Sequence, residues 1–378
     1  MRKVHVLLLA LILTAPVVAE AQSSVYSPLG IGFLGRPIGT RSRATGGGLS
    51  SFDGRSALNP AATGGFRSLS ITGSIGTQLR SYSALGATAD GLRETRAPFG
   101  QFGAWIRGTP LSVSLTYYPY ADRTYNLIAI DTVDIRGDSV QTADRIFSDG
   151  TVADIAGALA YTISSRLSLG GAIHLITGSA RAGARRDFAH TGYLSAAEQV
   201  NLGFNGLGFS VGFMAALMRQ ITISVAFRND NRLETIADSV AFSSIQLPMT
   251  FSGGLLLRPL PGLVWGTTVI RQTWSDAAQD LEQIGGANAY DTWEVASGFE
   301  LGGVPGSTRI PLRLGFRYAQ LPFSSSDQPH EIDISAGSAI DFAGDRAVFE
   351  FSVERIFRKG GGADENAWYL TFSVTLRP

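Results

Sequence analysis

The end of the chain shows a pattern that recurs along most of its length. In NAWYLTFSVTLRP, residues 366–378, the side chains at 368, 370, 372, 374 and 376 are apolar, whereas polar side chains and one tyrosine alternate with them. Successive side chains of a strand point to opposite faces, so this segment predicts a strand with one apolar and one polar wall. A helix would spread the apolar positions around its axis. About ten residues is the length of a tilted strand that crosses a membrane.

The same alternation appears in LSVSLTYY, ITISVAFR, WEVASGFEL, IPLRLGFRY and FEFSVE. Counting segments of this kind predicts about fourteen strands, and bacterial single-chain barrels have an even number of strands. We place them near 68–80, 99–107, 110–119, 152–163, 166–178, 199–216, 220–230, 247–258, 261–273, 290–301, 308–320, 331–343, 346–356 and 367–377.

The connections between these strands alternate in length. Longer pieces follow every odd strand, at 81–98, 120–151, 179–198, 231–246, 274–289, 321–330 and 357–366, and short turns follow the even strands. Outer-membrane barrels have long extracellular loops and short periplasmic turns, so the barrel would begin and end on the periplasmic side. The alternative is a soluble sandwich or propeller, which has no reason to sort its loops by length. We therefore predict an all-β protein, a transmembrane antiparallel β-barrel of about fourteen strands.

Composition agrees with a barrel that crosses a membrane. Only 16% of the residues are charged, there are 45 glycines, and there is no cysteine. A typical soluble domain has about 25% charged residues. Residues 1–21 are expected to be a signal peptide, with Arg2 and Lys3 before an apolar stretch and Ala-Glu-Ala at the cleavage site. The chain carries no net charge, which argues against a nucleic-acid partner.

Residues 22–66 do not alternate and are rich in glycine and proline. A barrel of fourteen strands is too wide for wall side chains to fill, so we expect this segment to be a hatch in the lumen, and residues 67–378 to be the barrel. The candidate gate residues are Gly46, Gly47, Gly48, Asn59, Pro60 and Ala61. Glycine lets two backbones approach closely, and the Asn59 amide can donate to the wall and accept from it.

The stretch GGGLSSFDGRSALNPAATGGF, residues 46–66, resembles the N-terminal hatch of the FadL family of outer-membrane transporters of long-chain fatty acids and other hydrophobic compounds. The shared features are a glycine run followed by Asn-Pro-Ala, here Asn59, Pro60 and Ala61. The resemblance implies a fourteen-stranded barrel with a lumenal hatch. A related barrel, the type IX secretion shuttle, is a rival relative.

Charged residues on the polar faces of the strands are expected to face the lumen, because intramembrane charges must pair or meet water. They are Arg228, Glu294, Glu300, Arg313, Arg317, Asp333, Glu350 and Glu354. One interpretation is a network that ties the wall to the hatch. The other is a path for an amphipathic ligand, with Arg313 and Arg317 attracting a carboxylate.

No motif of an enzyme is present, and no catalytic residue, metal site or cofactor is predicted. We expect His174 to be a hydrogen-bonding residue of the lumenal wall. The predicted function is passive uptake of a small hydrophobic or amphipathic, fatty-acid-like compound across the outer membrane of a diderm bacterium, gated by the hatch. Alternatives are a docking or assembly partner of a secretion system and a sealed structural barrel. The expected partners are outer-membrane lipid, a small hydrophobic ligand, and a periplasmic or secretion-system protein.

Overall fold

The computed structural model describes residues 24–84, 87–135, 137–190, 192–283, 287–302, 310–343 and 346–377. The predicted signal peptide lies outside these residues. No helix among them is both long and apolar enough to cross a membrane.

Fourteen antiparallel strands among the described residues pair into a closed ring, and β21 pairs back with β2. In order of pairing they are β2 Ser70–Ala84, β4 Gly100–Trp105, β5 Leu111–Asp122, β7 Asp138–Ser164, β8 Leu167–Phe188, β9 Ala196–Ala216, β10 Ile221–Asp230, β13 Met249–Leu260, β14 Leu263–Gln272, β16 Thr292–Leu301, β17 Leu312–Gln320, β19 His330–Phe342, β20 Ala347–Gly360 and β21 Ala363–Leu376. The predicted barrel class and strand number are confirmed.

The two faces of the ring have the distribution expected of a barrel in lipid. On β21, Trp368 is 48% exposed and faces outward, whereas its neighbours on the lumenal side, Thr371 and Thr375, are buried. Exposed leucine, isoleucine, valine and aromatic side chains recur around the outside of the ring. Apolar surface directed away from the core is stable only where lipid covers it.

Short turns gather at one end of the barrel, and four of them are described completely, at 106–110, 165–166, 217–220 and 261–262. At the opposite, long-loop end, several predicted loops are strands instead: β3 Ala87–Arg96, β6 Tyr125–Ile135, β11 Arg232–Ala237, β12 Val240–Gln246, and the outer parts of β7, β8 and β9. The loop assignments for these residues were wrong. Above the membrane neither face of a strand contacts lipid, so the sequence loses the strict alternation that marks the crossing segments.

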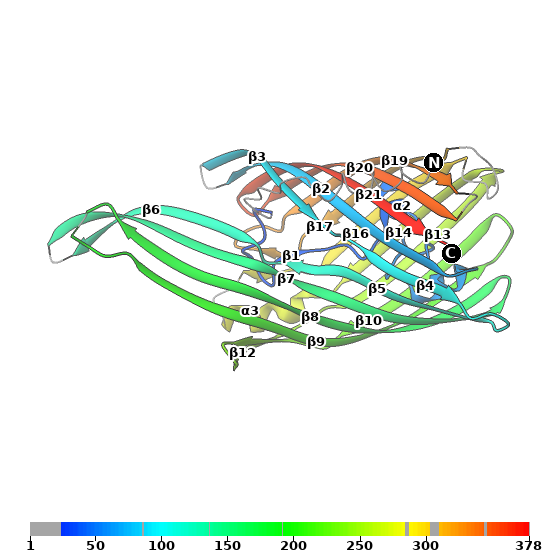
Figure 1. Cartoon of the computed structure of the whole chain (residues 1–378), viewed down its shortest axis with the longest axis horizontal. Helices are drawn as coiled ribbons and strands as arrows, with labels where there is room; N and C mark the ends of the chain where they lie inside the picture. The colour runs from blue at the N-terminus through cyan, green and yellow to red at the C-terminus, as the bar shows by residue number, and fades with distance from the viewer. Residues whose placement is uncertain are drawn as a thin grey trace.

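Strands β6 to β9 form a projection that reaches far beyond the rest of the barrel (Figure 1). β7 alone has 27 residues, more than twice the roughly 9–11 that a membrane crossing needs. β6 is paired with β7 and with no other described strand.

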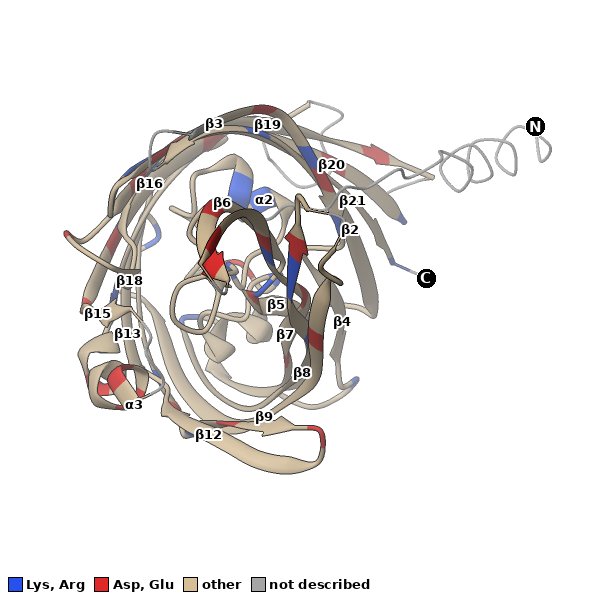
Figure 2. Ribbon diagram, turned by 90° about the vertical axis from the view of Figure 1, so that its left-hand side faces the viewer, with Lys and Arg blue, Asp and Glu red and all other residues tan. Residues whose placement is uncertain are grey.

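The chain from Ser24 to Phe66 lies inside the ring, and we call it the lumenal segment (Figure 2). It contains the short strand β1 Phe33–Leu34, the helix α2 Thr40–Ala44 and the 3-10 helix η1 Pro60–Gly65. Helix α2 contacts β17, β19, β20 and β21, whereas η1 contacts β5, β7, β8 and β9. The segment therefore touches opposite sides of the wall.

A cap covers part of the long-loop end. It is built from η2 Trp274–Ala277, α3 Ala278–Gln283 and the two-residue strands β15 Asn288–Ala289 and β18 Phe323–Ser324. Trp274 and Leu281 are buried there against Phe323, and Ile31 of the lumenal segment belongs to the same apolar cluster. The lumenal segment is thus held at this end by ordinary hydrophobic packing.

Candidate functional site

Three wall glycines form a flat shelf beneath the glycine run of the lumenal segment. They stand side by side in register on β14, β16 and β17: Gly266, Gly298 and Gly315. A Cβ on Gly315 would lie 2.0 Å from the carbonyl carbon of Thr45, and one on Gly298 would lie 2.3 Å from the Thr45 oxygen. A Cβ on Gly46 would approach the backbone of Phe316 to 2.8 Å. Backbone therefore packs on backbone, which only glycine permits.

A second glycine shelf lies under the Asn-Pro-Ala motif. Gly170 of β8 and Gly212 of β9 are partners in register, and added Cβ atoms would meet Pro60 and Asn59 at 2.4 and 2.0 Å. The Asn59 amide donates to the Phe213 carbonyl across this shelf (3.3 Å), and its oxygen accepts from the Ala61 amide and caps η1. The structure thus brings Asn59, Pro60 and Ala61 together with the wall, far from Gly46, Gly47 and Gly48.

Arginines of the lumenal segment reach carboxylates of the wall. Arg41 makes two hydrogen bonds of 2.9 Å to Glu300. Arg55 donates to Glu350 at 2.6 Å, and Glu354 accepts from Arg36 and Arg43 at 3.2 and 3.3 Å. These four arginines were not among the predicted site residues. Arg36, Arg41 and Arg43 stand just before the glycine run in RPIGTRSRATGGG, and Arg55 follows it. This clustering around the glycine run is the signal that marks them.

The wall also pairs its own charges. Arg313 bridges Glu300 (2.6 Å) and Glu350 (2.9 Å). Arg317 contacts Glu294 (2.9 Å) and Asp333 (2.7 Å) and is also bound to Glu331. All eight predicted lumenal charges face inward. Seven of them belong to two groups of ion pairs, one with Glu300, Arg313 and Glu350 and the other with Glu294, Arg317, Asp333 and Glu354. Arg228 belongs to a separate cluster.

Within the lumenal segment, Asp53 accepts a hydrogen bond from Ser42 and lies beside the guanidinium group of Arg55. Burial alone would raise the pKa of Asp53, but the guanidinium groups of Arg55 and Arg41, with hydrogen bonds from Arg55 N and Ser42 Oγ, hold that pKa below its usual value. Asp53 is therefore a carboxylate that fixes the orientation of Arg55 toward Glu350.

The separate cluster has the connectivity of a serine–histidine–aspartate triad. His174 Nδ1 lies 2.9 Å from Asp154 Oδ2, and His174 Nε2 lies 2.9 Å from Ser210 Oγ. Asp154 is also bound by Tyr118 (2.6 Å) and Arg228 (2.7 Å). All three triad side chains are buried, and none of them lines the lumenal cavity. The predicted role of His174 as a hydrogen-bonding wall residue is confirmed.

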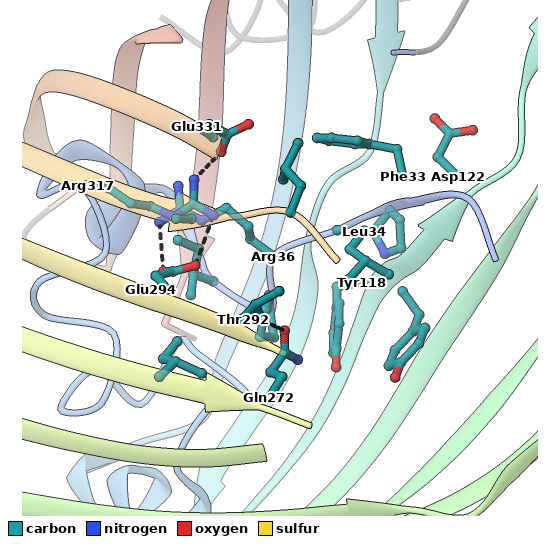
Figure 3. A pocket seen from close by; sticks show the side chains of 18 of the residues that line it. Phe33, Leu34, Arg36, Tyr118, Asp122, Gln272, Thr292, Glu294, Arg317 and Glu331 are labelled. Carbon is teal, nitrogen blue, oxygen red and sulfur yellow. Dashed lines mark hydrogen bonds and ion pairs between the residues drawn. The ribbon is translucent and has the colours of Figure 1, made fainter. Parts of the chain in front are cut away.

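A cavity of about 260 Å³ lies between the lumenal segment and the wall near the long-loop end (Figure 3). Its aromatic side chains are Tyr26, Phe33, Tyr118, Tyr120, Phe227, Trp274, Phe323 and Tyr369. Seven arginines and seven carboxylates also line it: Arg36, Arg43, Arg80, Arg96, Arg228, Arg317, Arg358, Glu94, Asp122, Asp230, Glu294, Glu331, Asp333 and Glu354. Each has an opposite charge in contact with it, so the lining carries no net charge, and the larger part of its surface is apolar.

The wall is discontinuous beside this cavity. Strand β3 pairs with β2 and with no other described strand, and β4 pairs with β5 only as far as Tyr117. Beyond that point Asp122 and Ala121 of β5 pair with Phe33 and Leu34 of the lumenal segment instead. An ion pair between Arg96 and Asp122 spans the gap, which we call the seam. The lumenal segment, rather than the next wall strand, completes the edge of β5.

Comparisons with known proteins agree with this architecture. The family model BamG matches residues 1–230, which is more than half of the 378 residues. No curated protein matches the sequence.

Several solved structures have the same fold at low identity. The Ralstonia pickettii toluene transporter TbuX is 15% identical over 90% of this chain and 98% of its own (TM-score 0.62). A Pseudomonas aeruginosa FadL homologue is 13% identical over 91% of this chain and 99% of its own (TM-score 0.61). The CymD monoaromatic hydrocarbon channel is 14% identical over 90% of this chain and 97% of its own (TM-score 0.59). The resemblance to the FadL family is confirmed in the fold, and the match along most of the chain shows that this protein belongs to the BamG family.

Proposed function

We propose that this protein is a passive outer-membrane channel for a small, neutral hydrophobic or amphipathic compound. The observation that carries the proposal is the cavity between the lumenal segment and the wall, which reaches the seam. The structural neighbours, which are hydrocarbon channels and toluene transporters by name, add support. The projection and the longer connections would face outward from the cell.

The size of the cavity favours a compact ligand. A dry cavity of about 150 Å³ holds one benzene molecule, so about 260 Å³ suits a substituted single ring better than a long acyl chain. The charges argue in the same direction. Arg317 is already bound to Glu294, Glu331 and Asp333, and Arg313 to two glutamates, which leaves neither arginine free for a ligand carboxylate.

We place the gate at β1 of the lumenal segment, where it pairs with β5. Two glycine shelves hold the 46–66 stretch against several wall strands, whereas β1 and its neighbours Gly32 and Gly35 contact the edge of one wall strand, β5, with two residues in register. Release of β1 would open the seam from the cavity toward the bilayer.

The absence of cysteine from the sequence allows a clean test with a disulfide. Leu34→Cys and Ala121→Cys are partners in register, and their disulfide would lock β1 onto β5. We expect oxidised cells to take up toluene no faster than cells without the protein, and reductant to restore uptake. The control pair is Phe349→Cys with Val374→Cys, which joins β20 to β21 on the lipid face. Undiminished uptake by the oxidised Leu34–Ala121 pair would refute the gate.

A second candidate function is assembly of other outer-membrane proteins. The family carries the name of a Bam component, and the projection exposes Ile128 and Ile130 on an edge strand (59% and 73% exposed). If this is the main role, Ile128→Asp with Ile130→Asp should lower the amounts of other barrels in the outer membrane and leave toluene uptake unchanged. Quantitative proteomics of outer-membrane fractions measures the first effect.

A further inference from the structure

The lipid-facing surface has a basic sector at the long-loop end, across β20, β21, β2 and β3, which are neighbours in the ring (Figure 1). Arg355, Trp368, Leu79 and Arg93 follow one another in register across these four strands. Lys359 lies four residues beyond Arg355 on the same face of β20. The apolar band of β21 ends at Trp368, so the row marks the outer boundary of the membrane.

The cations of this sector have no protein counter-ion. The Arg355 guanidinium lies over the rings of Phe357 (4.6 Å) and Trp368 (5.1 Å), and no carboxylate among the described residues pairs with it. Arg93 and Lys359 are exposed and likewise form no ion pair within the described chain. Asp364 stands opposite Lys359 in the register, yet no ion pair joins the two.

Several exposed arginines elsewhere on the surface do have partners. Arg271 also lies over a tryptophan, Trp293, at 5.2 Å, but it is bound to Asp291 at 3.2 Å. Arg185 and Arg232 are bound to Asp187 and Asp280, both at 2.9 Å. In the β20–β3 sector the unpaired cations instead lie along one row across neighbouring strands, beside the aromatic rings at the end of the apolar band.

A cation at the boundary of the hydrocarbon layer is stabilised by an anionic headgroup. The planar guanidinium matches the oxygens of a phosphate, and aromatic stacking holds Arg355 in place before it binds. Strands lie about 4.8 Å apart, so three spacings separate the backbones of Arg355 and Arg93 by roughly 14 Å. That span suits two phosphates better than one.

We infer that this sector binds the headgroup of an outer-leaflet lipid with two phosphates, of the lipid A type. Arg355 contacts one phosphate, with Lys359 above it, and Arg93 contacts the other. The site lies on the outer face of the wall, opposite the face that lines the cavity, so it stands whether or not the protein is a channel; Arg93 lies on β3, whose free edge borders the seam.

Native mass spectrometry of the full-length barrel in detergent tests the site, with lipid A as the probe beside its monophosphoryl and dephosphorylated forms. We expect R93Q/R355Q/K359Q to retain about a hundredfold less lipid A than the wild type, because each surface cation contributes roughly fivefold. The matched control R185Q/R232Q/R271Q makes the same change in charge and should retain lipid A as the wild type does. Gel mobility with and without heating reports whether each barrel is folded.

We expect the monophosphoryl form to bind more weakly than lipid A, and the dephosphorylated form to bind most weakly of the three. Equal retention by the triple variant and the wild type, or equal binding of dephosphorylated lipid, would overturn the inference. The single variant K359Q changes an exposed side chain and keeps the test decisive if the triple variant does not fold: it should lose lipid A several-fold, and no loss counts against the site.

Discussion

Replacing Gly298 and Gly315 together by alanine is expected to unseat the lumenal segment and raise the ion conductance of the barrel. Both added methyl groups would lie within 2.3 Å of the backbone of Thr45. Neither backbone can yield easily, because the wall strand is fixed by its pairing on both sides. Overpacking of this kind costs about 1–3 kcal/mol at each site. The segment must then move away from β16 and β17, and its ion pairs with Glu300 and Glu354 lengthen.

Single-channel recordings in planar bilayers measure the effect, with the wild type as the closed reference. The control is Gly73→Ala with Gly157→Ala, since an added Cβ at either position meets no heavy atom within 4 Å. This pair changes the same number of glycines in the wall and should leave the conductance unchanged. If the folded Gly298→Ala/Gly315→Ala barrel conducts no better than the control, these two glycines are not needed to hold the lumenal segment in place.

The membrane-crossing part of the fold was predictable because lipid imposes a rule on the sequence. Every second residue of β21 must be apolar, and Trp368, Phe372 and Val374 show this directly. The projection obeys no such rule, because water reaches both of its faces. Residues 125–135, which form β6, were therefore assigned to a loop.

The lumenal site was predictable in its residues but not in its contacts. Gly46–Gly48 and Asn59 stand out in the sequence. The wall glycines that they contact, such as Gly315 and Gly212, look like ordinary interruptions of a strand pattern. Which wall glycines share a row depends on the register of the closed ring. The seam was not predictable either, because no local sequence pattern indicates that β5 pairs with β4 as far as Tyr117 and with β1 beyond it.

Arg317→Met is expected to destabilise the barrel more than any other single substitution in the wall network. Methionine fills part of the space of the side chain but leaves Glu294, Glu331 and Asp333 without their shared partner. Arg317, Glu331 and Asp333 are each less than 10% exposed. Removing one member of a buried, hydrogen-bonded charge cluster costs about 3–5 kcal/mol, because the remaining charges stay desolvated.

Urea titration of the refolded barrel in lipid vesicles, followed by tryptophan fluorescence, measures the change in the free energy of unfolding. Arg185→Met serves as the control, because its pair with Asp187 is exposed on the projection and exposed pairs contribute little. The second substitution Asp333→Asn should recover part of the loss, since among the described residues Asp333 would otherwise keep no ion pair shorter than its 3.8 Å contact with Arg36. An unchanged midpoint for Arg317→Met would mean that water in the adjoining cavity already solvates the three carboxylates, and the network would then position the lumenal segment without stabilising the wall.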